Sequence, residues 1–186
     1  MDDQEVLCGK LEIPRHLWRD GRDLDQDFSN DELLFRWYPP GVQIEANGQI
    51  SAAAMSAVFR DTFDVSVARS RYSEHSTDVL YNPFKIPHRF HSGVLEARVS
   101  DIRNLHCVDS LNAAREFDFD LAHKPEVCFY PHSHIEVLEN GSKVTQKPKP
   151  PTLRTRIREE LRRAFKICHL PDPSYRPPGE ANNNSS

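Results

Sequence analysis

The stretch EVCFYPHSHIEVLE, residues 126–139, alternates two unlike sets of side chains. Because side chains of a β-strand point alternately to opposite faces, this pattern predicts a strand with one apolar and one polar face. The apolar face is expected to hold Val127, Phe129, Ser133, Ile135 and Val137. The polar face is expected to hold Cys128, Tyr130, His132, His134 and Glu136. We expect the apolar face to be buried and the strand to end at the Asn140-Gly141 turn.

The polar face has three interpretations. Two histidines at positions i and i+2 of a strand lie about 7 Å apart, which is near enough to share a metal ion. The same side chains can perform acid–base catalysis without a metal. A solvated or partner-facing strand needs neither, and we favour it. We therefore expect no metal site and no cofactor.

A second strand is predicted at LLFRWY, residues 33–38, because Pro39-Pro40-Gly41 ends this aromatic run. Arg36 lies inside it, and a half-buried arginine needs a partner. We favour a structural ion pair with an acid. The alternative is an arginine that holds an anion, together with Ser66, Arg69 or His134.

The remaining pattern predicts an α+β fold. It combines a small mixed or mainly antiparallel sheet with short helices and an appended C-terminal amphipathic helix. Further strands are expected at 42–45, 65–68 and 94–99, a short helix from Ser51, and helical turns at 76–81, near 100–101 and at 111–115.

Charge divides the chain more clearly than its total of −4 suggests. Residues 1–50 hold five Lys/Arg against eleven Asp/Glu, a net of −6, whereas residues 143–186 hold ten against four, a net of +6. We expect an acidic N-terminal arm at 1–30 and a core domain at 31–142. A Lys/Pro linker with a basic helix follows at 143–170, and a disordered tail at 171–186.

The predicted helix at 152–166 carries an apolar stripe and a basic face. Its cations are candidate partner-binding residues: Arg154, Arg156, Arg158, Arg162, Arg163 and Lys166. The stripe must be buried, and docking on the chain's own acidic body is favoured. Binding to an acidic protein comes next, nucleic acid is less favoured, and no membrane contact is expected.

Four cysteines stand at positions 8, 107, 128 and 168, without a CxxC pair. No apolar run resembles a signal peptide or a membrane span. The composition therefore predicts free thiols in a reducing, cytoplasmic location.

Several phrases resemble a family of small, uncharacterised bacterial proteins: LLFRWYPP (33–40), SAVFRD (56–61), VSVARS (65–70), ARVSDIRNL (97–105) and PHSHIEV (131–137). The resemblance spans residues 31–142 and implies a compact cytosolic bacterial domain with no assigned activity. The recurring positions match Arg36, Phe59, Ser66, Arg103, His134 and Val137. This chain departs from the pattern at His132, where a small residue is usual.

Together these features favour a non-enzymatic accessory or adaptor subunit of a bacterial multi-protein system. Its partner would be another protein of the same operon, and a phage-defence or toxin–antitoxin operon would suit it. The alternative is a small hydrolase or nuclease that uses His134 with His132, Glu136 and Arg36.

Overall fold

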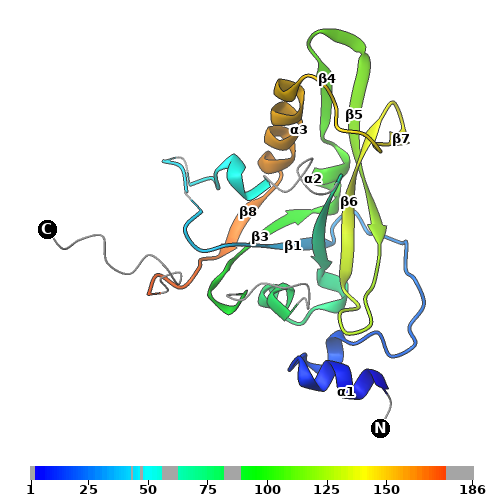
Figure 1. The fold of residues 1–186 in the computed structure, drawn as a ribbon, viewed down its shortest axis with the longest axis vertical. Helices are drawn as coiled ribbons and strands as arrows, with labels where there is room; N and C mark the ends of the chain where they lie inside the picture. Colours follow the sequence, from blue (N-terminus) through cyan, green and yellow to red (C-terminus); the bar gives the residue numbers. More distant parts are fainter. Residues whose placement is uncertain (1–2, 43, 47, 56–62, 82–88, 175–186) are drawn as a thin grey trace, which may run out of the picture.

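One curled antiparallel sheet organises the structure, a computed structural model that describes residues 3–42, 44–46, 48–55, 63–81 and 89–174. Its strand order is β4-β5-β6-β2-β1-β3-β8, with β7 beside β6. The strands are β1 Leu33–Tyr38, β2 Asp64–Arg69, β3 Gly93–Arg98, β4 His106–Asp109, β5 Asn112–His123, β6 His132–Glu139, β7 Ser142–Lys143 and β8 Lys166–His169. In Figure 1, β1 and β3 run across the direction of β5 and β6. The α+β class with a mainly antiparallel sheet is confirmed.

The helices are short, and one of them covers a face of the sheet. The α-helices are α1 Asp3–Lys10, α2 Val99–Arg103 and α3 Pro151–Arg163. The 3₁₀ helices are η1 Arg15–Leu17, η2 Ala52–Met55, η3 Ser70–Tyr72, η4 Ser76–Tyr81 and η5 Arg89–His91. No described helix has the length and apolar character needed to cross a bilayer.

The strand predictions for β1, β2 and β3 are correct within one or two residues. Near the turn at the end of β1, Gly41 adopts a φ of 82°, which suits glycine. Tyr38 pairs with Gly93 on β3 and is fully buried. A Cβ atom at residue 93 would lie 2.2 Å from the Tyr38 ring, so only glycine fits there.

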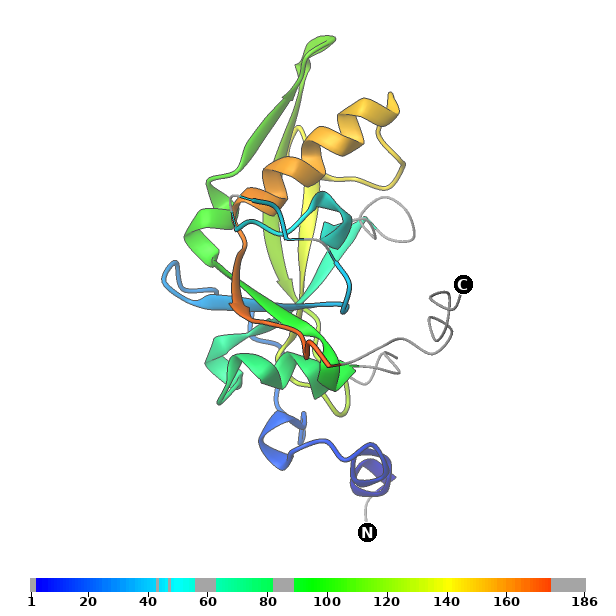
Figure 2. The ribbon, with the colours of Figure 1, turned by 90° about the vertical axis from the view of Figure 1, so that its left-hand side faces the viewer.

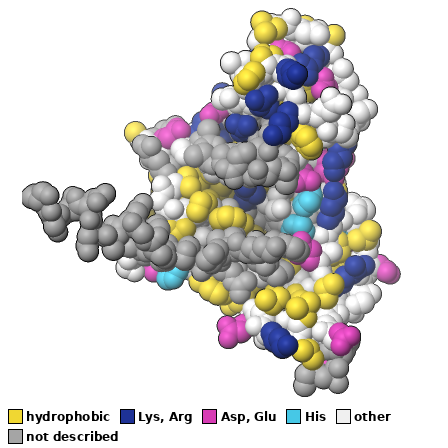
Figure 3. All heavy atoms as spheres, in the orientation of Figure 1, with side chains coloured by type: hydrophobic (Ala, Val, Ile, Leu, Met, Phe, Trp, Pro, Cys, Tyr) yellow, Lys and Arg dark blue, Asp and Glu magenta, His cyan; other side chains and the backbone are white. Residues whose placement is uncertain are grey.

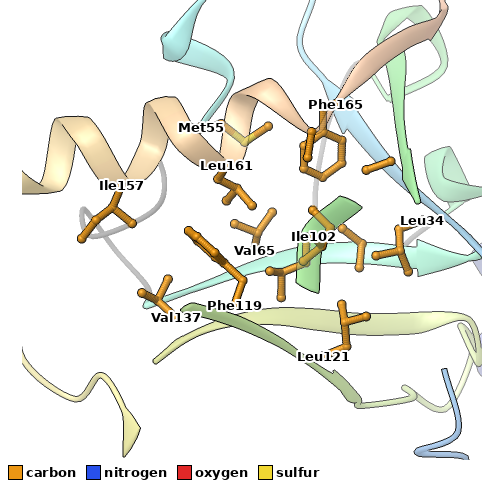
Figure 4. Close-up of a cluster of buried hydrophobic side chains, with 14 of the residues drawn as sticks. Leu34, Met55, Val65, Ile102, Phe119, Leu121, Val137, Ile157, Leu161 and Phe165 are labelled. Atoms are coloured by element: carbon orange, nitrogen blue, oxygen red, sulfur yellow. The ribbon is translucent and has the colours of Figure 1, made fainter. Parts of the chain in front are cut away.

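The main core lies between α3 and the sheet (Figures 2 and 4). Pro151 stands at the first turn of α3, where its missing N–H costs nothing. The helix then buries a stripe every four residues, Leu153, Ile157 and Leu161. These side chains pack in one cluster with Val65, Phe119 and Val137 from three strands, as Figure 4 shows for most of them. The helix therefore packs on its own chain.

The description of this helix as appended is not confirmed. After α3 the chain continues into β8, which pairs antiparallel with β3 and extends the sheet. Before α3, Val144 is buried in the main core. Both ends of the helix are thus tied to the sheet.

The second core lies on the opposite face of the sheet and is covered by the N-terminal segment. Its buried residues include Cys8, Ile13, Leu17 and Trp18 with Phe35, Val79 and Phe129. Cys8 and Cys128 form a disulfide whose Cα atoms are 5.3 Å apart. The prediction of free thiols is therefore wrong for this pair, and only Cys107 and Cys168 are free. The expected reducing location loses its support, because disulfides persist mainly in oxidising compartments.

Two further predictions differ from the structure. The strand expected at 126–139 begins only at His132, because residues 126–131 form turns around the Glu126–Phe129 bridge. Val127 is consequently 49% exposed, and Phe129 packs in the second core rather than with Ile135 and Val137. The helical turn expected at 111–115 is instead the start of β5, which pairs with β4 as a hairpin.

Some predictions lie partly or wholly outside the described residues. The helix expected from Ser51 is described only as η2, and residues 56–62 are outside. Residue 43 of the expected 42–45 strand is also outside the described residues. The described part of this segment forms a single bridge between Ile44 and Ile50. Residues 175–186 of the expected disordered tail are also outside.

Candidate functional site

Pairing of β2 with β6 creates a polar patch on one face of the sheet. Asp64 is paired with Glu136, and Ser66 with His134. Because paired residues share a face, the side chains of both pairs lie together, with His132 two residues further along β6. The intervening Val65, Ile135 and Val137 point into the main core. The predicted alternation of β6 therefore holds from residue 132 to the end of the strand.

The closest contact in this patch joins His134 and Asp64. The His134 Nδ1 atom lies 2.8 Å from Asp64 Oδ2, and the two side chains are only 19% and 17% exposed. Burial alone would raise the pKa of Asp64. The close contact with His134 and the nearby charges of His134, Lys143 and Lys124 outweigh burial, so this pKa lies below its usual value. His134 Nδ1 makes no well-aligned hydrogen bond among the described residues, so its close contact with the Asp64 carboxylate is mainly electrostatic.

His132 lies next to His134 and is more deeply buried. The two rings are perpendicular, with centroids 4.8 Å apart. His132 Nδ1 lies 2.8 Å from the Lys124 carbonyl oxygen, so this nitrogen carries the proton and donates it. Burial lowers the pKa of His132 to about 4, although the carbonyl acts in the opposite direction. His132 is therefore a neutral imidazole at neutral pH.

Glu126 is the second titratable side chain next to His132. Its Oε1 atom is 3.2 Å from His132 Nδ1. Burial raises the pKa of Glu126 to about 7, so near neutral pH this carboxyl group can hold or release a proton. Four titratable side chains thus follow one another in space, in the order Glu126, His132, His134 and Asp64.

Glu136 is engaged elsewhere. Lys124 Nζ and Lys143 Nζ both lie 2.6 Å from its Oε1 atom. Burial raises the pKa of Glu136, but these two hydrogen bonds and charges more than offset it, and the pKa is lowered. The acid that contacts His134 is therefore Asp64, which the sequence prediction did not include.

Arg36 is a buried cation on β1, just beyond the residues that pair with β2. These strands pair only at Leu34–Arg69 and Phe35–Ala68, and beyond this point they diverge. The Arg36 Nη1 group donates to the Ser66 carbonyl oxygen at 2.9 Å, and Nη2 to that of Ala54 at 3.5 Å. Arg36 is 8% exposed, and burial lowers its pKa to about 10. Arg36 shares a face of β1 with Leu34 and Tyr38, which lie in the main core, whereas the His134 side chain lies on the opposite face of the sheet. The prediction that Arg36 acts together with His134 is therefore wrong.

The cations of the basic helix divide into bound and exposed groups. Arg162 contacts Glu159, Glu45 and the Ile50 carbonyl, and its side chain is 11% exposed. Arg154 donates to the Pro148 carbonyl, and Arg163 pairs with Glu160. Burial, followed by the charge of Arg154, lowers the pKa of Arg158. Arg156, Arg163 and Lys166 are exposed. Figure 3 shows Lys and Arg side chains gathered over α3 on this face.

No group of three or more His, Cys, Asp or Glu in the described part of the chain has a geometry suited to a metal ion. Two further histidines lie outside this patch and differ in burial. His123 is 1% exposed, and its ring bonds the Asp25 amide and the Tyr130 carbonyl, so it holds the N-terminal segment in place. His91 is half-buried and pairs with Asp172.

Searches of models of known families, of curated proteins and of solved structures find no match.

Proposed function

We propose that the chain is a small hydrolase in which His134 is the general base and Asp64 orients it. The observation that carries the proposal is the 2.8 Å contact between His134 Nδ1 and the Asp64 carboxylate at a partly shielded position. An ionised Asp64 favours a proton on the facing Nδ1 atom, and in that tautomer Nε2 is the nitrogen that can accept a proton. Acid–base pairs of this kind contribute about 10²–10⁴-fold to hydrolytic rates.

The neighbouring groups support the same chemistry. In the first step, His134 Nε2 takes a proton from water, and the oxygen of that water attacks the ester or phosphodiester bond. The proton then passes to the departing oxygen. His132 and Glu126 form a short chain of groups behind His134, and the pKa of Glu126 near 7 lets it exchange protons at neutral pH.

The test compares hydrolysis of chromogenic carboxyl esters and phosphodiesters by wild-type protein, His134→Gln and Asp64→Asn. We expect His134→Gln to lose about 100-fold or more in kcat, and Asp64→Asn to lose a similar factor. His106→Gln is the matched control, because His106 also contacts an aspartate at 2.8 Å but lies at an exposed edge of the sheet. Equal activity of His134→Gln and wild type, or no wild-type turnover of either substrate class, would contradict the proposal.

An adaptor subunit is the second candidate, favoured by the exposed cations of α3 and its C-terminal end. Arg156, Arg163 and Lys166 are exposed in a segment of net charge +6. Such a surface suits an acidic protein partner encoded in the same operon. Because the apolar stripe of α3 is buried in the main core, contact with a partner would be made by this basic face alone.

Co-expression with the neighbouring genes, followed by size-exclusion chromatography, tests the adaptor. Arg156→Glu with Lys166→Glu should abolish the complex and leave the melting temperature of the isolated chain unchanged, because both side chains are exposed. A complex that survives these changes would exclude this surface. Binding to nucleic acid instead would show a log-linear loss of affinity with salt.

A further inference from the structure

The N-terminal helix α1 is attached to the rest of the molecule mainly through one side chain. Cys8 is the only buried residue of α1, and its sulfur atom is bonded to that of Cys128 in the turn at 126–131. Val6 and Leu7 are 37% and 48% exposed, so the helix buries no apolar stripe. In Figure 2, α1 lies at the end of the molecule opposite α3. The disulfide is therefore the principal attachment of this helix.

The other interactions of α1 are weak by comparison. Gln4 donates to the Val127 carbonyl oxygen at 3.0 Å in an exposed position, and Glu5 forms an exposed ion pair with Arg15. Exposed ion pairs contribute little to stability, because solvent screens them. A helix of eight residues is also unstable by itself, since isolated helices shorter than about 12 residues do not offset the cost of nucleation. Without the disulfide, α1 should therefore detach and unfold.

The segment that follows α1 is held independently of the disulfide. Leu17 and Trp18 are buried in the second core. The Tyr130 amide donates to the Leu17 carbonyl oxygen at 2.6 Å, and the Arg19 amide donates to that of Val127 at 3.1 Å. Breaking the Cys8–Cys128 bond therefore releases α1 while η1 and the sheet keep their contacts.

The disulfide is buried, and α1 controls access to it. Cys8 and Cys128 are 0% and 3% exposed, so a reductant reaches their sulfur atoms only when α1 moves. Segments with few buried contacts open locally at a small cost in free energy. The weak attachment of α1 therefore makes this buried bond reducible in the folded protein.

We propose that the Cys8–Cys128 bond is a redox switch that controls the docking of α1. A dithiol reductant supplies two electrons and two protons. One of its thiolates attacks a sulfur atom, the Sγ–Sγ bond breaks, both cysteines become thiols, and the dithiol becomes a disulfide. α1 then detaches, and the Cys128 thiol becomes exposed in the same turn as Glu126, which contacts His132. This inference does not depend on the proposed hydrolase.

The first experiment measures amide hydrogen exchange of the full-length native protein, oxidised and after treatment with dithiothreitol, with reduction confirmed by mass spectrometry. The amides of residues 7–10 are the ones with partners inside α1. We expect their exchange to become about ten-fold or more faster on reduction, because α1 unfolds. Exchange in β6, which lies inside the sheet, should stay the same. A disulfide that dithiothreitol reduces only in denaturant would overturn the switch, and so would equal protection of α1 in both forms.

Thiol reactivity gives a second measurement with an internal control. In the reduced native protein, Cys8 and Cys128 should react with iodoacetamide about ten-fold or more faster than Cys107, which is buried in the main core. Reaction of all three at the slow rate of Cys107 would overturn the switch.

A double variant, Cys8→Ser with Cys128→Ser, is the matched control for the reductant itself. It should show fast exchange of α1 with and without dithiothreitol. A change on adding dithiothreitol to this variant would mean that the reductant acts elsewhere, which would overturn the switch. Equal acceleration of α1 and β6 in reduced wild type would mean that the bond stabilises the whole fold, and would also overturn a switch confined to α1.

Discussion

Glu126 and His132 are neighbours whose burial affects their charges in opposite ways. Burial raises the pKa of Glu126 from 4.5 to about 7 and lowers that of His132 from 6.5 to about 4. Around pH 5 to 6 both side chains are therefore mainly uncharged in the folded protein. The 3.2 Å approach of Glu126 Oε1 to His132 Nδ1 is then a contact between neutral groups rather than an ion pair.

The raised pKa of Glu126 predicts a pH-dependent loss of stability. Between pH 4.5 and about 7 the folded state keeps this proton and the unfolded state releases it. The free energy of unfolding should therefore fall as the pH rises through this window, relative to Glu126→Gln, which cannot titrate. Urea unfolding of both proteins from about pH 5 to about pH 8 measures the difference. Parallel stability profiles would contradict the shifted pKa.

His132→Gln is the matched comparison, and relative to it the wild-type stability should change with pH in the opposite direction. The unfolded state binds a proton to His132 below pH 6.5, whereas the folded state resists it down to about pH 4. Wild-type stability relative to this variant should therefore fall as the pH decreases from 6.5 to 4. The difference in free energy of unfolding between wild type and each variant should change with pH in opposite directions for Glu126→Gln and His132→Gln. This result would show that each pKa shift belongs to its own side chain.

At the scale of elements, α3 is a structural part of the fold, and this leads to a stability prediction. Leu161 is fully buried between α3 and the sheet. Leu161→Ala should lower the free energy of unfolding by about 2–5 kcal/mol because it leaves a cavity. Thr155→Ala, an exposed change on the same helix, should alter it by less than about 0.5 kcal/mol. Urea denaturation compares the two. A small effect of Leu161→Ala would mean that α3 does not pack as described.

Elements with a strong local pattern could be predicted from the sequence, and the others could not. β1 is predicted by an aromatic run that ends at prolines. The helix at 151–163 is predicted by apolar residues that recur every four positions. Phe117, Phe119 and Leu121 of β5 alternate with aspartates, but the polar start of this strand is typical of a turn, and the sequence therefore predicts a helical turn there instead. β8 has four residues and no clear pattern, so only its pairing with β3 defines it.

The candidate site divides in the same way. His132 and His134 could be assigned to one face of a strand because alternation is a local property. The contact of His134 with Asp64 depends on the register between β2 and β6, which no local pattern reveals. The turn at 126–131 also depends on distant residues, since the Tyr130 amide donates to the Leu17 carbonyl and Cys128 bonds Cys8.

At the scale of the whole molecule, the disulfide ties the N-terminal segment to the centre of the chain. Cys8 and Cys128 are 120 residues apart in sequence, and both are buried. Without reduction, the unfolded protein should contain two reactive thiols, Cys107 and Cys168, as counted by alkylation and mass spectrometry. Replacing both Cys8 and Cys128 by serine should lower stability by about 2–5 kcal/mol, whereas Cys168→Ser should have a smaller effect. Four reactive thiols before reduction would contradict the bond.

Pairing of β2 with β6 also determines when the candidate site can exist. Ser66 and His134 are paired although 68 residues separate them in sequence. Asp64 lies on β2 and His134 on β6, so neither strand alone holds both members of the proposed pair. Pairing over such distances is slow, because the loop entropy is lost before the contact forms. A ribosome-bound chain that has not yet exposed β6 therefore carries Asp64 but lacks His134. Any chemistry at this site begins only after the middle of the sheet has closed.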